Sequence, residues 1–215
     1  MKTQFKTKKS LNLNLVVWIY VLAFILMTWS FKSYAKNDKQ IPDSKGNPIV
    51  IIDTTMGKIK VKLNSEKAPI TVENFLKYVD KKFYDKTIFH RVIENFMIQG
   101  GGHLDNLIEK NDVFPPITNE AKNGLSNKRG TIAMARTGEI NSATAQFFIN
   151  VVDNTRLDYV SDTNYGYAVF GEVIDGMDVV DKIKQVKVVT KTTAEGPFEN
   201  VPAQTITIKS IRKGK

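Results

Sequence analysis

Short β-type stretches separated by turn residues dominate the sequence after residue 48, and this pattern restricts the fold more than any other feature. Each stretch is too brief for a helix, and each is rich in β-branched or aromatic residues or alternates polar with apolar positions. The stretches are 49–55, 58–63, 88–92, 96–99, 131–135, 147–151, 168–170 and 205–211. Helical spacing occurs at 68–79 and 177–183. Many short strands with two helices and no regular β-α alternation predict an antiparallel barrel or sandwich.

The two helical segments each carry one apolar face, which predicts that they pack on the strands. In the first, Pro69 suits a helix entrance, and the apolar residues recur at i, i+3, i+4 and i+7, namely Val72, Phe75, Leu76 and Val79. No internal repeat or linker follows Pro48. We therefore expect residues 48–215 to form one domain, preceded by a polar tether at 36–47.

The N-terminal segment is basic and then apolar, and it changes the meaning of the net charge. Residues 1–35 contain five lysines and no acidic residue, around an apolar run at 15–29. Small residues at Ser33 and Ala35 suit a signal peptidase, so we predict a secretory signal peptide cleaved after Ala35. The formal charge is +9 for all 215 residues, but 26 basic and 22 acidic residues, a balance of +4, remain after cleavage. We therefore expect no nucleic-acid partner. Nucleic-acid binding would need one basic patch made by Lys122, Lys128, Arg129 and Arg136.

An uncleaved membrane anchor is the alternative interpretation of residues 1–35. The apolar run is a little shorter than the ~20 residues of a spanning helix. Basic residues before it orient the following chain outward in either case. We expect an exported protein that contacts the membrane only through this N-terminal signal or anchor.

The absence of cysteine, with histidine only at His90 and His103, excludes several classes of chemistry. The chain has no disulfide framework, no thiolate nucleophile, and no site built from cysteines or several histidines. No G-x-S-x-G turn is present, which argues against a serine hydrolase. Asp175, Asp178 and Asp181 share helical spacing, but such a row is typical of a solvated face. We expect neither a metal nor a cofactor.

The triple glycine and the two histidines favour structural roles. Neither a Gly-Lys-Ser/Thr sequence nor a helix pattern follows residues 100–102, so the glycines indicate a sharp turn beside a pocket rather than phosphate binding. His90 lies in an apolar strand, where a histidine is more often a hydrogen-bonded structural residue than a catalytic one. His103 has no obvious charged partner nearby in the sequence.

Residues 89–102 combine side chains that suit a binding site. They read Phe-His-Arg-Val-Ile-Glu-Asn-Phe-Met-Ile-Gln-Gly-Gly-Gly, with a cation, aromatic rings, a thioether and an amide within a few positions. On the second strand, Met97 and Gln99 share a face. Taken alone, these residues also allow a simpler interpretation, in which Phe96 and Met97 are core and Arg91 is a surface ion-pair partner.

This segment resembles the signature of the cyclophilin family of peptidyl-prolyl cis–trans isomerases. Further blocks of that family follow in its order at 130–136, 142–150, 167–173 and 176–180. The resemblance extends from Ile49 to Ile211 and implies a mainly β fold, a closed antiparallel eight-stranded barrel capped by two α-helices. The tail at 196–202 and Tyr167 resemble the periplasmic cyclophilins of Gram-negative bacteria in particular. This implies a periplasmic location, in agreement with the predicted export signal.

The resemblance also implies roles for particular residues. Arg91 would be the catalytic arginine, and Gln99 the polar partner that orients it or the substrate. Ala135 and Gln146 would line a neighbouring groove, and Tyr167 takes a place where many eukaryotic members have histidine. The apolar pocket for the proline ring would consist of Phe96, Met97, Phe148 and Leu157. The implied partners are Pro-containing polypeptide substrates, no cofactor is implied, and we expect a monomer.

Two departures from the family pattern affect drug binding. Arg156 stands where eukaryotic members commonly have a tryptophan that packs against cyclosporin, and the loop 158–166 is longer than theirs. We therefore expect weak cyclosporin binding.

The expected function is accelerated rotation about X-Pro peptide bonds, which would assist the folding of exported proteins. The alternative is a chaperone or scaffold of the same fold that holds Pro-containing segments without turnover. The presence of Arg91 with the full pocket favours catalysis, because a pure binder needs no hydrogen-bond donor over the prolyl nitrogen.

Overall fold

The computed structural model describes residues 46–194 and 196–214. The predicted signal peptide at 1–35, its cleavage position and almost all of the tether at 36–47 lie outside the described residues. No helix in the described part of the chain is both long and apolar enough to cross a lipid bilayer.

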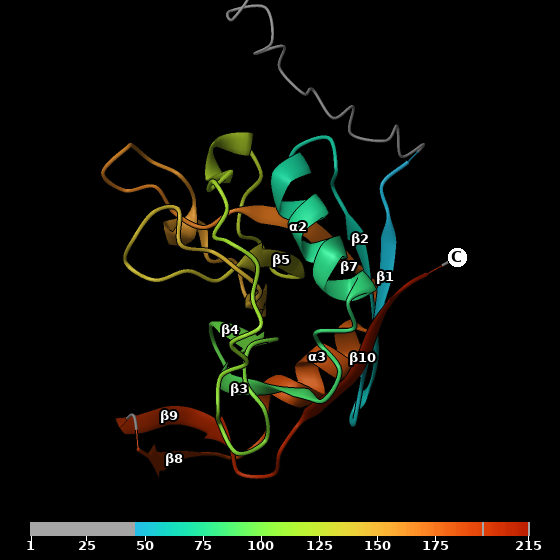
Figure 1. The fold of residues 1–215 in the computed structure, drawn as a ribbon, viewed down its shortest axis with the longest axis vertical. Coiled ribbons are helices and arrows are strands. Elements are labelled where there is room, and N and C mark those ends of the chain that lie inside the picture. The colour runs from blue at the N-terminus through green and yellow to red at the C-terminus, as the bar shows by residue number, and fades with distance from the viewer. Residues whose placement is uncertain (1–45, 195, 215) are drawn as a thin grey trace, which may run out of the picture. The chain divides into compact units, whose positions relative to one another are not determined.

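Eight of the described strands form one closed antiparallel barrel (Figure 1). They are β1 (Ile49–Thr54), β2 (Gly57–Leu63), β3 (Thr87–Ile93), β4 (Met97–Gly100), β5 (Thr131–Met134), β6 (Phe147–Asn150), β7 (Val169–Asp175) and β10 (Thr207–Lys213). Their order around the barrel is β1-β10-β3-β4-β6-β5-β7-β2, and β2 pairs with β1 to close it. The predicted eight-stranded barrel is confirmed, and the sandwich alternative is wrong.

Alternation along the strands builds the barrel interior. In β2, the alternating residues Ile59, Val61 and Leu63 are fully buried, and Val50 and Ile52 of β1 are buried as well. Strands β1 and β2 pair as a hairpin, as their sequences predict. Because side chains alternate between the two faces of a strand, each strand gives one row of residues to the core and another to the outer wall.

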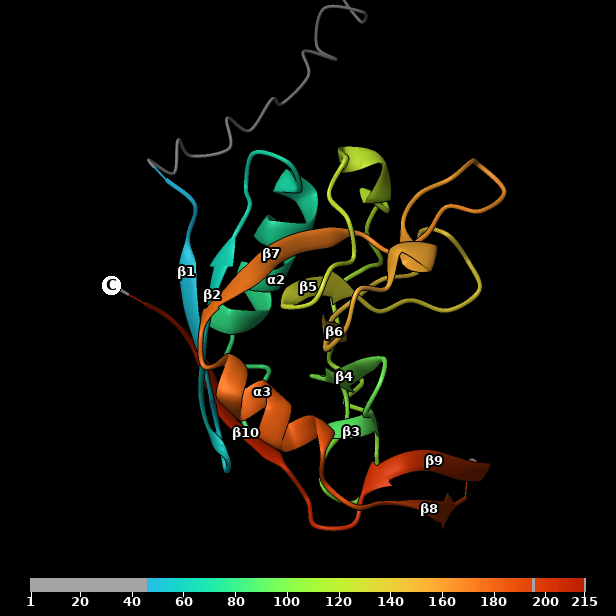
Figure 2. The ribbon, with the colours of Figure 1, turned by 180° about the vertical axis from the view of Figure 1, so that it is seen from behind.

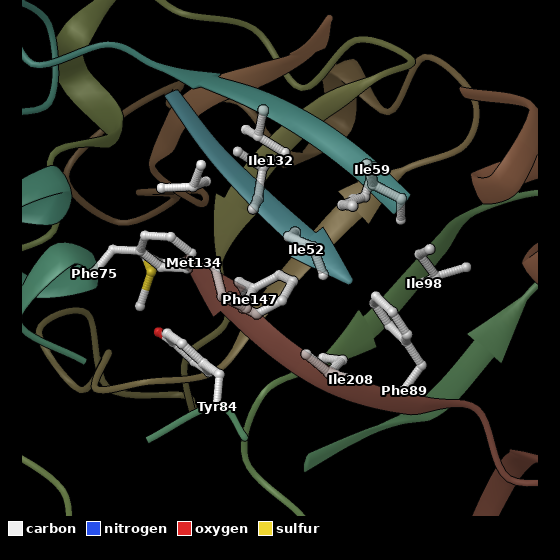
Figure 3. Packing of buried hydrophobic residues seen from close by; sticks show 14 of the residues in the cluster. Ile52, Ile59, Phe75, Tyr84, Phe89, Ile98, Ile132, Met134, Phe147 and Ile208 are labelled. Atoms are coloured by element: carbon white, nitrogen blue, oxygen red, sulfur yellow. The ribbon is translucent and has the colours of Figure 1, made fainter. Parts of the chain in front are cut away.

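Aromatic rings fill the core beside helix α2 (Pro69–Asp80) (Figure 3). Phe75 from this helix meets Tyr84, Phe147 and Phe170, with ring centroids 5.1, 5.8 and 5.2 Å apart. Phe147 of β6 also meets Tyr84 and Phe89 edge-on, at 5.7 and 6.2 Å. Edge-to-face pairs are favoured by the ring quadrupole, so this cluster stabilises the barrel beyond the burial of apolar area.

The second predicted helix is α3 (Met177–Lys184), and it is confirmed as well. It buries Val179, Val180 and Ile183 against the barrel. The preceding Gly176 has φ +86°, and a Cβ at this position would lie 2.3 Å from the carbonyl oxygen of Lys58. Only glycine fits there, because both the left-handed backbone and the close approach exclude a side chain.

The structure contains one hairpin that the sequence pattern does not predict. It consists of β8 (Val188–Thr193) and β9 (Gly196–Pro202), which form a separate two-stranded sheet. Both views place it beside β3 (Figures 1 and 2). Strand β9 contains Pro197 and Pro202, which argue against a strand in a sequence, since proline cannot donate to a ladder. The hairpin forms because Phe198 and Val201 pack on the barrel residues around Ile88.

Candidate active site

A hollow of about 240 Å³, here named the central pocket, lies where β3, β4, β6 and β5 are neighbours in the barrel. Its lining includes eight of the nine predicted site residues. They are Arg91, Phe96, Met97, Gln99, Ala135, Phe148, Leu157 and Tyr167. The ninth, Gln146, lines an adjacent hollow of the same size, which shares Gln99, Ala135 and Arg136 with the central pocket.

Strand register explains why these residues meet. Arg91 on β3 is opposite Gln99 on β4, and Gln99 is opposite Phe148 on β6. Residues in register on neighbouring strands project from the same face of the sheet. The adjacent residues Ile98 and Phe147 are buried in the main core. The site residues therefore project from the outer wall of the barrel.

The central pocket has an apolar floor. Met97 and Phe148 are only 2% and 4% exposed. Phe148 meets Tyr167 edge-on, with ring centroids 5.7 Å apart. Partly buried members of the same cluster include Phe96, Ala135, Leu157 and Tyr167. A concave apolar surface of this kind suits a small apolar group of a ligand.

Arg91 lies at the edge of this floor with its hydrogen-bonding groups unused. Its side chain is half-buried, and it forms no hydrogen bond or ion pair with the residues that the structure describes. A guanidinium has five N–H donors and no acceptor. The donors of Arg91 are therefore available to a ligand in the central pocket.

Two hydrogen bonds determine the direction of the glutamine side chains. Gln146 Nε2 donates to Glu109 Oε1 at 2.7 Å, and Gln99 Nε2 donates to Gln146 Oε1 at 3.1 Å. Because a carboxylate only accepts, Glu109 sets the orientation of both amides and leaves Gln99 Oε1 as an acceptor. The side chain of Gln99 forms no hydrogen bond to the side chain of Arg91 in the described part of the chain, and its predicted role as the partner of Arg91 or of the substrate stays a prediction. No sequence signal pointed to Glu109.

Two arginines lie against the aromatic walls of the pocket. The guanidinium of Arg136 lies 4.6 Å from the ring centroid of Tyr167, and its Nε donates to the carbonyl oxygen of Gly166 at 3.0 Å. Arg156 lies 4.8 Å over the ring of Phe96. Arg136 lies at the end of the family block 130–136, but the sequence alone suggested only a place in a basic patch.

Asn127 braces the loop that brings Leu157 and Tyr167 into the pocket. Its side chain is fully buried, and its Nδ2 donates to the carbonyl oxygens of Leu157 at 3.2 Å and Tyr167 at 3.3 Å. It also donates to Asp158 Oδ1 at 3.0 Å. Both ends of the loop are therefore held by one residue, which sequence reasoning missed because an asparagine outside a strand resembles an ordinary turn residue.

His90 behaves as a structural residue. It is 5% exposed, its ring centroid lies 4.3 Å from that of His103, and its Nδ1 has no hydrogen-bond partner among the described residues. Burial, followed by the nearby His103 and Arg91, lowers the pKa of His90 to about 3. The ring is therefore neutral at physiological pH, and the hydrogen bond expected for a structural histidine is absent at Nδ1.

We expect the stability of the fold to decrease as the pH falls from about 6.5 toward 3. The unfolded chain protonates His90 near its ordinary pKa of 6.5, whereas the folded protein does so only near 3. Between these values the unfolded state binds more protons, so the free energy of unfolding rises with pH. Urea unfolding of the wild type and His90→Phe at about pH 5 and about pH 7 tests this. The free energy of unfolding should fall less from about pH 7 to about pH 5 in the variant than in the wild type. An equal fall in both proteins would contradict the prediction.

Two of the four basic residues of the patch considered for nucleic-acid binding are engaged in ion pairs. Lys122 pairs with Asp162 at 2.6 Å, and Arg129 pairs with Asp181 at 2.7 Å. These pairs reduce the positive charge of the basic patch considered above, while the expected absence of a nucleic-acid partner stays a prediction. Within the described residues, no group of three or more His, Asp or Glu side chains is placed to hold a metal ion.

The fold and the pocket define a class of protein: a closed β-barrel with an apolar pocket and an unengaged arginine on its outer wall. Residues 49–213 match the family model described as cyclophilin type peptidyl-prolyl cis-trans isomerase/CLD. The chain therefore belongs to the cyclophilin family and is a peptidyl-prolyl cis–trans isomerase.

Bacterial isomerases are similar over most of the chain. The chain is 52% identical to peptidyl-prolyl cis-trans isomerase A of Dickeya dadantii over 163 residues, which cover 76% of this chain and 83% of the relative. It is 52% identical to isomerase B of Escherichia coli over 165 residues, 76% of this chain and 98% of the relative. A solved cyclophilin type isomerase of Cryptosporidium parvum, crystallised in the presence of the dipeptide Ala-Pro, matches with a TM-score of 0.60 and 25% identity. That match covers 78% of this chain and 99% of the other.

Proposed function

We propose that the central pocket is the active site for isomerisation, with Arg91 as its catalytic residue. The observation that carries this proposal is that Arg91 is half-buried, borders an apolar pocket and has no side-chain hydrogen bond or ion pair among the described residues. The relative crystallised in the presence of Ala-Pro supports a Pro-containing peptide as the ligand. The substrate ring would lie among Phe96, Met97, Phe148 and Leu157.

The chemistry of an X-Pro bond explains why an arginine is useful. The nitrogen lone pair is delocalised into the carbonyl, which gives a rotation barrier of ~18–20 kcal/mol. In the twisted transition state the lone pair is localised on a pyramidal nitrogen and accepts a hydrogen bond. A donor fixed at that point stabilises the twisted state more than either planar state, and one such preorganised donor contributes ~3–4 kcal/mol.

The remaining residues position the peptide. Holding the proline ring fixes one end of the bond while the preceding carbonyl group turns. Gln99 Oε1, oriented through Gln146, is an acceptor for a backbone N–H of the substrate. Ala135 and Gln146 line the adjacent hollow, which suits the neighbouring substrate residue. Tyr167 closes the pocket against Phe148.

The alternative is that the pocket binds Pro-containing segments without turnover, as in a chaperone or scaffold of the same fold. An isomerisation assay with a short Pro-containing peptide separates the two. The proposed function requires a faster cis–trans exchange, and a binder would show affinity for the peptide without acceleration. The unengaged donors of Arg91 favour the first outcome.

We also propose that the enzyme assists the folding of exported proteins in the periplasm. The support is the sequence of residues 1–35, with five lysines, an apolar run and small residues at 33 and 35. The intact mass of the exported protein tests the cleavage. We expect the mass of a chain that starts at Lys36. The mass of the full-length chain, found in the membrane fraction, would indicate an uncleaved anchor.

We expect cyclosporin to bind weakly, because Arg156 replaces the tryptophan that packs against the drug in eukaryotic members. In this structure Arg156 lies over the ring of Phe96, so a charged group occupies this rim of the pocket. Isothermal titration calorimetry measures the affinity of the wild type and of the matched variant Arg156→Trp for cyclosporin. The variant should bind more tightly, and a submicromolar dissociation constant for the wild type would contradict the prediction.

A further inference from the structure

A second hollow, of about 370 Å³, lies between the barrel wall and the β8–β9 hairpin. We name it the hairpin pocket. His90, Arg91 and Gln99 line it on the barrel side, and residues 197–200 of β9 line it on the other side. Arg91 and Gln99 also line the central pocket, so the two hollows adjoin and share these two side chains.

The wall formed by the hairpin is anchored to the barrel. Phe198 and Val201 belong to a small apolar cluster with Ile88 and Leu107. The ring of Phe198 also meets His103 edge-on, with centroids 5.4 Å apart. The wall is therefore in place before a ligand binds, and a preformed wall lowers the entropic cost of binding.

A polypeptide substrate must continue beyond its proline in both directions. The central pocket is apolar and suits the ring, and the hollow at Gln146 adjoins it on one side. The hairpin pocket adjoins it through Arg91 and Gln99. When the proline of a peptide lies in the central pocket, a residue about one position away from that proline therefore reaches the hairpin pocket.

The charges around the hairpin pocket favour a basic side chain. Glu199 is exposed and forms no ion pair with the residues that the structure describes. His90 adds no positive charge, because burial lowers its pKa to about 3. Arg91 is half-buried at the junction, where the proposed function engages it with the prolyl bond. A long Lys or Arg side chain can lay its methylene stem along the β9 wall and bring its charge to Glu199.

We propose that the hairpin pocket is a subsite for a substrate residue flanking the proline, and that Glu199 makes it prefer Lys or Arg over Asp or Glu. This inference rests on the proposed function, because the peptide is placed by its proline in the central pocket. It assigns to the hairpin, which the sequence pattern did not predict, a role in substrate preference.

The test compares isomerisation of matched peptides that carry Lys, Ala or Glu at one position, scanned on both sides of the proline. For the wild type at low salt, kcat/KM for the Lys peptide should exceed that for the Glu peptide by about twofold to fivefold at one position. In Glu199→Gln this ratio should fall to about one. In Glu199→Lys it should fall below one, so that the Glu peptide becomes the better substrate. Glu66→Lys, at an exposed residue outside the pocket, changes the net charge equally and should leave the wild-type ratio intact.

The outcomes separate the subsite from the proposed function. If the wild type turns over the Ala peptide but no position shows a ratio that Glu199→Lys reverses, the subsite assignment is wrong and the isomerase site stands. If Glu66→Lys reverses the ratio as well, the preference comes from net charge and the assignment is also wrong. Absence of turnover of the Ala peptide by the wild type would overturn both proposals.

Discussion

Replacing Arg91 with alanine is expected to lower kcat/KM for X-Pro isomerisation by about a hundredfold or more, because the variant loses a preorganised donor to the transition state. The fold should be unaffected, since the Arg91 side chain forms no hydrogen bond or ion pair with the described residues. The measurement is isomerisation of a Pro-containing peptide followed by exchange NMR, with circular dichroism to confirm the fold.

Two matched variants sharpen this test. Arg91→Lys keeps the positive charge but lacks the planar guanidinium with its fixed donors, so it should recover only part of the activity. Arg129→Ala removes an arginine that pairs with Asp181 and does not line the central pocket, and it should retain full activity. Unchanged turnover in Arg91→Ala would refute the mechanism proposed for this pocket.

Phe147→Ala is expected to destabilise the fold by about 3–5 kcal/mol, because it removes a large side chain from a rigid core. Phe147 is fully buried and contacts the rings of Phe75, Tyr84 and Phe89. These rings come from different elements and cannot all move to fill the cavity. The free energy of unfolding from denaturant titration is the measurement.

Val160→Ala serves as the control for this loss. Val160 is 67% exposed, so its truncation should change the free energy of unfolding by no more than about 0.5 kcal/mol. A similar small effect for Phe147→Ala would mean that the aromatic cluster is not what holds the barrel together.

Local sequence pattern was sufficient for most individual elements. The alternation of Ile59, Val61 and Leu63 identified β2 because an exposed strand face next to a buried one produces period two. The same pattern left open whether the strands close into a barrel or stack as a sandwich. Alternation identifies a buried face but not the strand that covers it, so closure followed only from the family resemblance and from the structure.

The β8–β9 hairpin shows where local pattern fails. Pro197 and Pro202 weaken the strand signal of β9, because a proline cannot donate a backbone hydrogen bond to a neighbouring strand. Its stability comes from Phe198 and Val201 against Ile88, a contact between residues far apart in the sequence. Tertiary packing therefore outweighed local propensity at this position.

The sequence was enough to predict the eight barrel strands, the two helices and, through the family motif, the residues of the central pocket. Arg91 and Gln99 lie eight positions apart in one motif, which made them recognisable. Only the tertiary structure brought in Glu109, which orients the glutamines, and Glu199, on the wall of the hairpin pocket. The physical reason is that a single acidic residue in a loop or edge strand has no period or spacing to reveal it. Its function depends on which distant side chains the fold places within hydrogen-bonding reach.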